Sequence, residues 1–178
     1  MHRVLEIAPL RRLAELDIAW CLHFNRASHR RELERLFTVI SRLGDGVFWY
    51  TLMLALMLAQ GPAALPVVGR MLLAGALSLI LYKWLKARTT RPRPCARHDH
   101  IRATVAPLDE YSFPSGHTLH AVSFSIIAVY YYPGLAWLVL PFTVLVALSR
   151  LVLGLHYPSD VLAGILLGAA LASLTLQI

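Results

Sequence analysis

Long apolar runs separated by short polar breaks make up the chain from residue 47 onward. A helix needs ~20 residues to cross the hydrocarbon core of a bilayer, so the first and third runs are short by that standard. No run shows the two-residue alternation that strands show. The pattern predicts an all-α fold, a polytopic membrane helix bundle with five spans. The runs cover residues 47–59, 66–86, 117–131, 134–150 and 158–177.

The first 42 residues differ from the rest, with eight arginines, five acids and scattered apolar positions. Leu13 and Ile18, and then Leu36, Val39 and Ile40, recur at roughly helical spacing, which predicts two short amphipathic helices. We expect these helices to lie at the membrane interface and cover the rim of the domain. An alternative is that they guide anionic lipid head groups inward. By length the chain is one domain, with an N-terminal part (1–42) and a catalytic membrane part (43–178).

Composition supports a membrane protein, because 57% of the residues are hydrophobic and only 15% are charged. The net charge of +7 comes mainly from the N-terminal part and one loop. This distribution favours a bilayer and a phosphate group as partners, and it argues against nucleic acid. Cys21 and Cys95 lack the spacing of a metal site, and nothing in the sequence requires them to form a disulfide.

Three polar stretches are predicted to meet on one face of the bilayer: the loop 87–114, the start of the third apolar run, and the link between the fourth and fifth. The first follows Lys86 and contains Arg93, whose guanidinium can donate two hydrogen bonds to a phosphate. The prolines on either side, Pro92 and Pro94, stiffen the chain there. The alternative for this basic cluster is a positive-inside anchor at a helix end.

The second stretch, Ser115-Gly116-His117, directly precedes an apolar run. Ser115 suits the N-cap of a helix, Gly116 allows close approach of a ligand, and free N–H groups at a helix start favour an anion. His117 could donate a proton to a leaving oxygen. The alternative is a capped helix with an incidental histidine.

The third stretch contains Arg150, His156 and Asp160, and its two charged residues are the only Asp, Glu, Lys or Arg after residue 110. Asp160 can reach back to one ring nitrogen of His156, which leaves the other nitrogen free for nucleophilic attack. Arg150 would clamp a phosphate. The alternative is a buried Arg–Asp pair beside an incidental histidine, since membrane charges are costly unless they are paired or functional.

The sequence shows no carboxylate cluster for magnesium, no Cys/His set for zinc and no Walker-type loop. We therefore expect phosphoryl transfer through a histidine nucleophile, with no metal or other cofactor.

These motifs resemble those of the type 2 phosphatidic acid phosphatases, whose core is shared with vanadium haloperoxidases. The family pattern is Lys-x6-Arg-Pro, then Pro-Ser-Gly-His, then Ser-Arg-x5-His-x3-Asp, and it is met in full between Lys86 and Asp160. The resemblance implies six membrane helices, so five to six are expected. It also implies that His156 becomes phosphohistidine, that Asp160 holds it and that His117 is the general acid. The implied phosphate pocket consists of Lys86, Arg93, Ser115, Gly116 and Arg150.

The expected activity is hydrolysis of a lipid phosphate or pyrophosphate, with undecaprenyl pyrophosphate favoured. Phosphatidylglycerophosphate, phosphatidic acid and a lipid A phosphate are alternatives, and a non-hydrolytic lipid-phosphate binder or transporter is a rival of another class. The resemblance implies a bacterial inner membrane with the site facing the periplasm, whereas a literal count of arginines places the site in the cytoplasm. His120 is expected to pack, and His98 and His100 either pack or contact a head group.

Overall fold

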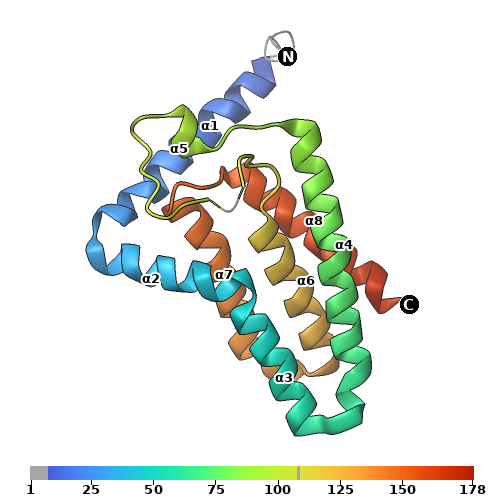
Figure 1. The fold of residues 1–178 in the computed structure, drawn as a ribbon. Helices are drawn as coiled ribbons and strands as arrows, with labels where there is room; N and C mark the ends of the chain where they lie inside the picture. The colour runs from blue at the N-terminus through green and yellow to red at the C-terminus, as the bar shows by residue number, and fades with distance from the viewer. Residues whose placement is uncertain (1–7, 108) are drawn as a thin grey trace.

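The computed structural model describes residues 8–107 and 109–178, and it confirms the all-α class (Figure 1). Within these residues the extended pairing is limited to one isolated bridge between Pro92 and Tyr111. Residues 1–7 of the predicted N-terminal part lie outside the described residues. The α-helices are α1 (Ala8–Asn25), α2 (Arg31–Arg42), α3 (Phe48–Gln60), α4 (Leu65–Thr89), α5 (Pro94–Arg97), α6 (Gly116–Tyr131), α7 (Ala136–Val152) and α8 (Pro158–Leu176). Short 3-10 or π turns lie at η2 (Arg26–His29), η3 (Leu43–Val47), η4 (Gly61–Ala64) and η5 (Pro133–Leu135).

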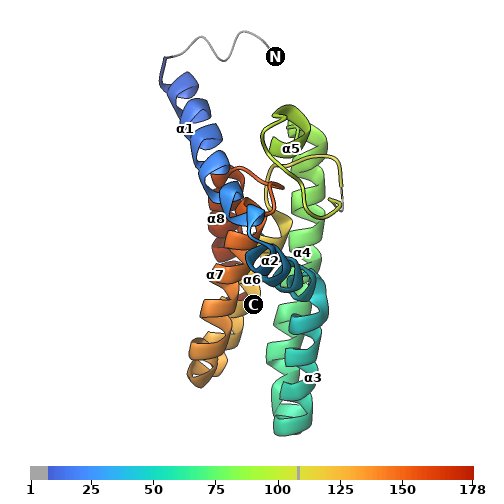
Figure 2. The same ribbon diagram turned by 90° about the vertical axis from the view of Figure 1, so that its left-hand side faces the viewer.

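The long helices form one bundle in which α4, α6, α7 and α8 run alongside one another (Figures 1 and 2). Among the described residues, three stretches are long and apolar enough to cross a membrane: Arg31–Thr89, Pro133–Val152 and Pro158–Leu176. This number is smaller than the five to six spans expected. The first stretch contains α2, α3 and α4, which the short segments η3 and η4 join, with a kink at Gly46 of η3. Helix α6 has 16 residues, fewer than the ~20 that a span needs.

Helices α6 and α8 pack closely because α8 presents two glycines to the backbone of α6. A Cβ atom at Gly164 would lie 2.7 Å from the carbonyl oxygen of Ser115, and one at Gly168 would lie 2.6 Å from that of Leu119. Only glycine fits at such distances, as in the small-residue contacts of membrane helices. The backbone N–H of Ser115 also donates to the carbonyl of Asp160 over 3.0 Å. The second and third predicted motifs are thereby brought together.

The N-terminal helices expose apolar side chains, among them Leu13, Leu36 and Val39, as expected for helices at a membrane interface. Helix α1 also has a buried face, where Cys21 and Asn25 contact the bundle. Both cysteine thiols are free.

The aromatic residues near the predicted span ends divide into two groups. Trp49 is fully buried and packs against Phe124 and Phe142. Its neighbour Tyr50 is exposed, because helix periodicity turns the two residues to different sides of α3. Trp84, Tyr130 and Trp137 are exposed as well.

Candidate active site

A cavity of about 520 Å³ lies at the end of the bundle where α4 and α7 end and α6 begins. Its polar end contains the bases and the two histidines of the three motifs. Its apolar part lies between α3 and α4. The lining includes Asp45, Trp49, Tyr50, Leu72, Ala76, Leu79, Lys83, Lys86, Arg93, Asp109, Gly116, His117, His120, Arg150 and His156.

Three bases at the polar end are almost fully buried: Lys86, Arg93 and Arg150 are 6%, 3% and 3% exposed. Arg150 donates through Nη1 to the hydroxyl of Ser41, and its Nε is buried without a hydrogen-bond partner among the described residues. A buried guanidinium without a carboxylate against it is expensive in an apolar surrounding. The site is therefore arranged to receive an anion.

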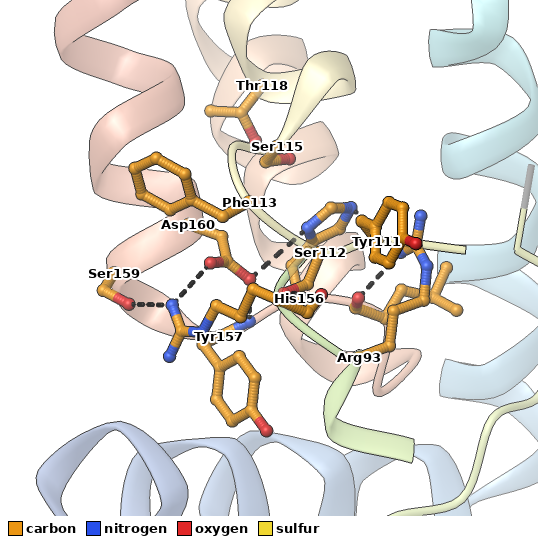
Figure 3. A network of polar contacts seen from close by, with 12 residues as sticks. Arg93, Tyr111, Ser112, Phe113, Ser115, Thr118, His156, Tyr157, Ser159 and Asp160 are labelled. Carbon is orange, nitrogen blue, oxygen red and sulfur yellow. Dashed lines mark hydrogen bonds and ion pairs between the residues drawn. The ribbon is translucent and has the colours of Figure 1, made fainter. Parts of the chain in front are cut away.

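His156 is 1% exposed and lies in the turn between α7 and α8. Its Nε2 is 3.2 Å from Nη1 of Arg93, and its Nδ1 is 3.6 Å from Oδ2 of Asp160 (Figure 3). A guanidinium only donates, so Nε2 accepts and the ring proton is on Nδ1, facing Asp160. Burial, together with the charges of Arg150, Arg93 and Lys86, lowers the pKa of His156 well below its ordinary value. The ring is thus a neutral base whose Nε2 lone pair faces Arg93 at the polar end of the cavity.

The backbone of this turn is held by α7 and by a glycine. The N–H groups of Leu155 and His156 both donate to the carbonyl of Arg150 over 3.1 Å. Gly154 has a φ of +70°, and a Cβ there would lie 2.7 Å from the carbonyl oxygen of Arg102. These contacts place the histidine beside the end of α7.

Asp160 has both carboxylate oxygens occupied. Oδ2 accepts from the backbone N–H of Tyr157 over 2.8 Å, and Oδ1 accepts from Nη1 of Arg91 over 2.6 Å. The first contact is part of a capping box at the start of α8. Arg91 was not among the predicted site residues, although it stands in the basic stretch that the sequence singles out. Spacing alone does not tell which arginine of Arg91-Pro92-Arg93-Pro94 faces the phosphate and which faces the aspartate.

His117 lies at the start of α6, and its Nε2 faces the carboxylate of Asp45. Asp45 belongs to η3, where Gly46 adopts a φ of +136°. In the sequence, Gly44-Asp45-Gly46 indicates only a turn and gives Asp45 no further role. Gly116 lines the cavity, and a Cβ there would lie 3.3 Å from the ring of Tyr82.

The structure does not bring Ser115 into the cavity. Ser115 is fully buried, and its hydroxyl oxygen is 2.9 Å from the hydroxyl oxygen of Thr118 (Figure 3). It stands at the N-cap position of α6, as predicted, but without a hydrogen bond from its side chain to the helix backbone. In this arrangement Ser115 joins α6 to α8 through its backbone.

Comparison with known proteins identifies the family. The model of the PAP2 superfamily matches residues 67–178. The chain belongs to the PAP2 superfamily. The resemblance seen in the sequence motifs is thereby confirmed.

The PAP2 relatives and solved structures that match this chain carry several names. A lipid A 1-phosphatase of Rhizobium johnstonii is 32% identical over 100 residues, 54% of this chain and 41% of that protein. An undecaprenyl-diphosphatase of Sulfolobus acidocaldarius is 39% identical over 70 residues, 39% of this chain and 34% of that protein. The chain thus covers less than half the length of these curated relatives. The crystal structure of a PAP2-type phosphatidylglycerolphosphate phosphatase from Bacillus subtilis superimposes with a TM-score of 0.76 at 25% identity, over 98% of this chain and 88% of that one.

One carboxylate of this PAP2 site lies where a phosphate is expected. Asp109, from the loop between α5 and α6, has Oδ1 2.6 Å from Nζ of Lys86 and 2.7 Å from Nη2 of Arg93. Its backbone carbonyl also accepts from Nε of Arg93 over 2.9 Å. Sequence reasoning missed Asp109 because the loop carries no periodic signal.

The remaining histidines of the PAP2 site region are placed as follows. His120 lines the cavity, and its ring nitrogens lie 3.1 Å and 3.2 Å from the carbonyl oxygens of Gly116 and Gly75. Both ring nitrogens therefore face the helix backbone. His98 stands edge-on to the ring of Tyr157, and His100 is exposed.

Proposed function

We propose that the chain is a membrane phosphatase that hydrolyses a lipid phosphate or pyrophosphate through a phosphohistidine intermediate. The observation that carries this proposal is the convergence of three buried bases on a buried, neutral histidine, with the Arg150 guanidinium left without an acidic partner among residues 8–107 and 109–178. A phosphate group would supply the missing negative charge. In a site of low polarity these bases would stabilise the charge that develops on the equatorial oxygens.

The reaction we propose has two steps. In the first, Nε2 of His156 attacks phosphorus, the P–O bond to the lipid breaks, and His117 donates a proton to the leaving oxygen. Asp160 faces Nδ1–H and stabilises the positive charge that the ring acquires. In the second step water attacks the phosphohistidine, the P–N bond breaks, and His117 takes up the proton of the water. Lys86, Arg93 and Arg150 bind the transferred phosphoryl group throughout, with Gly116 allowing close approach.

The apolar part of the cavity supports a lipid as the substrate. It runs from the phosphate end along α3 and α4, between aromatic and aliphatic side chains that include Tyr50, Leu72 and Leu79. An apolar cleft next to a phosphate site fits a head group with a hydrocarbon chain attached.

Among lipid substrates we favour a polyprenyl pyrophosphate such as undecaprenyl pyrophosphate. Lys83 lines the cavity beyond Lys86 and would lie beside the second phosphate. The relative from Sulfolobus acidocaldarius named as an undecaprenyl-diphosphatase supports the same choice. Phosphatidylglycerophosphate is the second candidate, favoured by the Bacillus subtilis structure, which matches nearly the whole chain. Phosphate release measured with undecaprenyl pyrophosphate, phosphatidylglycerophosphate, phosphatidic acid and lipid A separates them.

The nucleophile is tested with His156→Ala in detergent-solubilised protein, with the exposed His100→Ala as the matched control. We expect His156→Ala to lower turnover by more than about a thousandfold and His100→Ala to leave it unchanged. A His156→Ala variant that keeps most of its activity would show that another group attacks phosphorus. Wild-type protein that binds lipid phosphates but releases no phosphate from any of them would point to a binder or transporter. Turnover is expected to persist in EDTA, and dependence on added magnesium would contradict the metal-free mechanism.

We place the protein in a bacterial inner membrane with the cavity facing the periplasm. The bases near the cavity are explained by phosphate binding, so their number is a poor guide to sidedness. Single cysteines at the exposed positions Asp99 and Ala63, in a background without Cys21 and Cys95, would report the two faces. Labelling of Asp99→Cys but not of Ala63→Cys by an impermeant reagent on intact spheroplasts is the expected result, and the reverse pattern indicates a cytoplasmic site.

A further inference from the structure

Three polar or thiol side chains of α1 contact the segment from the end of α7 through the turn that carries His156 to the first turn of α8. Asp17, Cys21 and Asn25 follow one another at intervals of four residues and so share one face of the helix. Asn25 Nδ2 donates to the carbonyl of Val152 over 2.9 Å, and Cys21 Sγ is 3.4 Å from the carbonyl oxygen of His156. None of the three α1 residues lines the cavity. Helix α1 therefore holds this turn from outside the cavity.

Asp17 is the member of this face that reaches the charged groups of the site. Its Oδ2 is 2.8 Å from Nη2 of Arg91, and its Oδ1 accepts from the backbone N–H of Ser159 over 2.9 Å. The Ser159 hydroxyl contacts the same carboxylate. Asp17 thus joins α1 to Arg91 and to the first turn of α8.

The guanidinium of Arg91 is held by three side chains and lies over the ring of Tyr157. Nη2 pairs with Asp17, Nη1 donates to Ser159 Oγ over 2.7 Å and to Asp160 Oδ1 over 2.6 Å, and Cζ lies 4.0 Å from the centre of the Tyr157 ring. A planar guanidinium is suited to such a set of contacts, and it is preorganised by stacking on the ring.

The position of Asp160 depends on Arg91. One carboxylate oxygen accepts from the N–H of Tyr157 and the other from Arg91, and the hydroxyl of Ser112 also hydrogen-bonds the carboxylate. Together these contacts set the plane of the carboxylate that faces Nδ1 of His156. Without Arg91 the carboxylate would lose its one charged partner among these three and would be freer to rotate. Its Oδ2 is 3.6 Å from Nδ1, just beyond hydrogen-bonding distance, so the approach of the two groups is sensitive to that rotation.

We infer that Asp17 and Arg91 are positioning residues, which act through Asp160 to set the ring of His156 for attack on phosphorus. The inference rests on the proposed function. It extends the site to α1, which precedes the region matched by the PAP2 superfamily model. Misplacement of a reacting group by about 1 Å can cost a hundredfold in rate, so a network that acts only on placement can have a large effect on turnover.

The test uses full-length protein and undecaprenyl pyrophosphate, or phosphatidic acid if that is the lipid turned over. We expect Arg91→Gln to lower kcat about 10- to 100-fold and Asp17→Asn to lower it about 3- to 10-fold. KM and the inhibition constant of inorganic phosphate should stay within about twofold, because neither residue lines the cavity. The exposed Arg88→Gln and Asp99→Asn serve as matched controls and should leave kcat unchanged.

Two further measurements separate positioning from a general loss of structure. Arg91→Lys should recover part of the kcat lost in Arg91→Gln, because the ammonium keeps the charge but not the fork of donors. The double variant with Asp17→Asn should be no slower than Arg91→Gln alone, since Asp17 acts through Arg91. All rates are taken per folded protein, measured by thermal unfolding and gel filtration in detergent.

Values of kcat within twofold of wild type for Arg91→Gln would overturn the inference. So would a rise in KM and in the phosphate inhibition constant in parallel with the fall in kcat, which would place Arg91 in phosphate binding. Strictly additive losses in the double variant would show that Asp17 does not act through Arg91. If His156→Ala is active the proposed function itself fails, whereas an inactive His156→Ala beside a fully active Arg91→Gln removes only this inference.

Discussion

Replacement of Asp109 by asparagine should strengthen the binding of phosphate. In the structure its carboxylate pairs with Lys86 and Arg93, the two bases that a phosphate would need, so substrate must displace it. The side chain is 39% exposed, which limits each pair to the range of solvent-accessible ion pairs, about 0.2–1 kcal/mol. Two pairs together amount to about 0.4–2 kcal/mol. At 1.4 kcal/mol for each factor of ten, the inhibition constant of inorganic phosphate should fall about 2- to 30-fold.

The pH dependence of this effect follows from the charge of the carboxylate. Burial alone would raise the pKa of Asp109, but the hydrogen bonds and charges of Lys86 and Arg93 outweigh it and lower the pKa below its ordinary value. A carboxyl group with a lowered pKa stays ionised above its ordinary pKa, so the competition with phosphate persists through neutral and mildly acidic pH. The gain from Asp109→Asn should accordingly be constant between about pH 5 and pH 8.

The assay is inhibition of lipid phosphate hydrolysis by inorganic phosphate, with the neighbouring, exposed Glu110→Gln as the control. Glu110→Gln should leave the inhibition constant unchanged, which excludes a general effect of one negative charge. Weaker phosphate binding in Asp109→Asn would refute the reasoning, because it would mean that the carboxylate holds the two bases in place for phosphate. An equal change in both variants would refute it as well, since the effect would then be long-range.

Two other predictions follow from the buried charges of the site. Arg150→Met should raise the midpoint of thermal unfolding, because it removes a buried charge that has no acidic partner among the described residues. It should also weaken inhibition by inorganic phosphate about 10- to 150-fold, because a charged hydrogen-bond donor is lost. A variant that is less stable and still inhibited contradicts this. His156 should remain neutral at about pH 6, where an exposed histidine is mostly protonated. The fold lowers the pKa of His156, so its ring loses the second proton at a lower pH than an exposed histidine does. Nitrogen-15 NMR of the protein without phosphate, with the signal assigned by its loss in His156→Ala, checks this, and an imidazolium signal at pH 6 would disprove it.

The helical class and the placement of the three motifs at one end of the bundle could be predicted from the chain alone. Hydrophobic periodicity is a local signal, and alternating spans return the chain to the same face at regular intervals. The spacing between His156 and Asp160 is likewise short, so their approach needs only one turn and the first turn of a helix. The number of spans was less predictable, because the short segments η3 and η4 join α2, α3 and α4 into one apolar stretch.

Which carboxylates contact the bases in and around the site depends on the tertiary structure. Asp17 meets Arg91 across 74 positions of the chain, and Asp109 meets Lys86 across 23. In the sequence these acids are indistinguishable from solvated charges, since pairing depends on the path of the loops and on how α1 docks. The same holds for Ser115, whose type suits a phosphate pocket but whose hydroxyl the packing of α6 turns toward Thr118. The sequence by itself determined which residues we propose for phosphoryl transfer, because those residues form short motifs at helix ends. Their orientation was set by contacts between segments far apart in the chain, and only the folded bundle brings those segments within hydrogen-bonding distance.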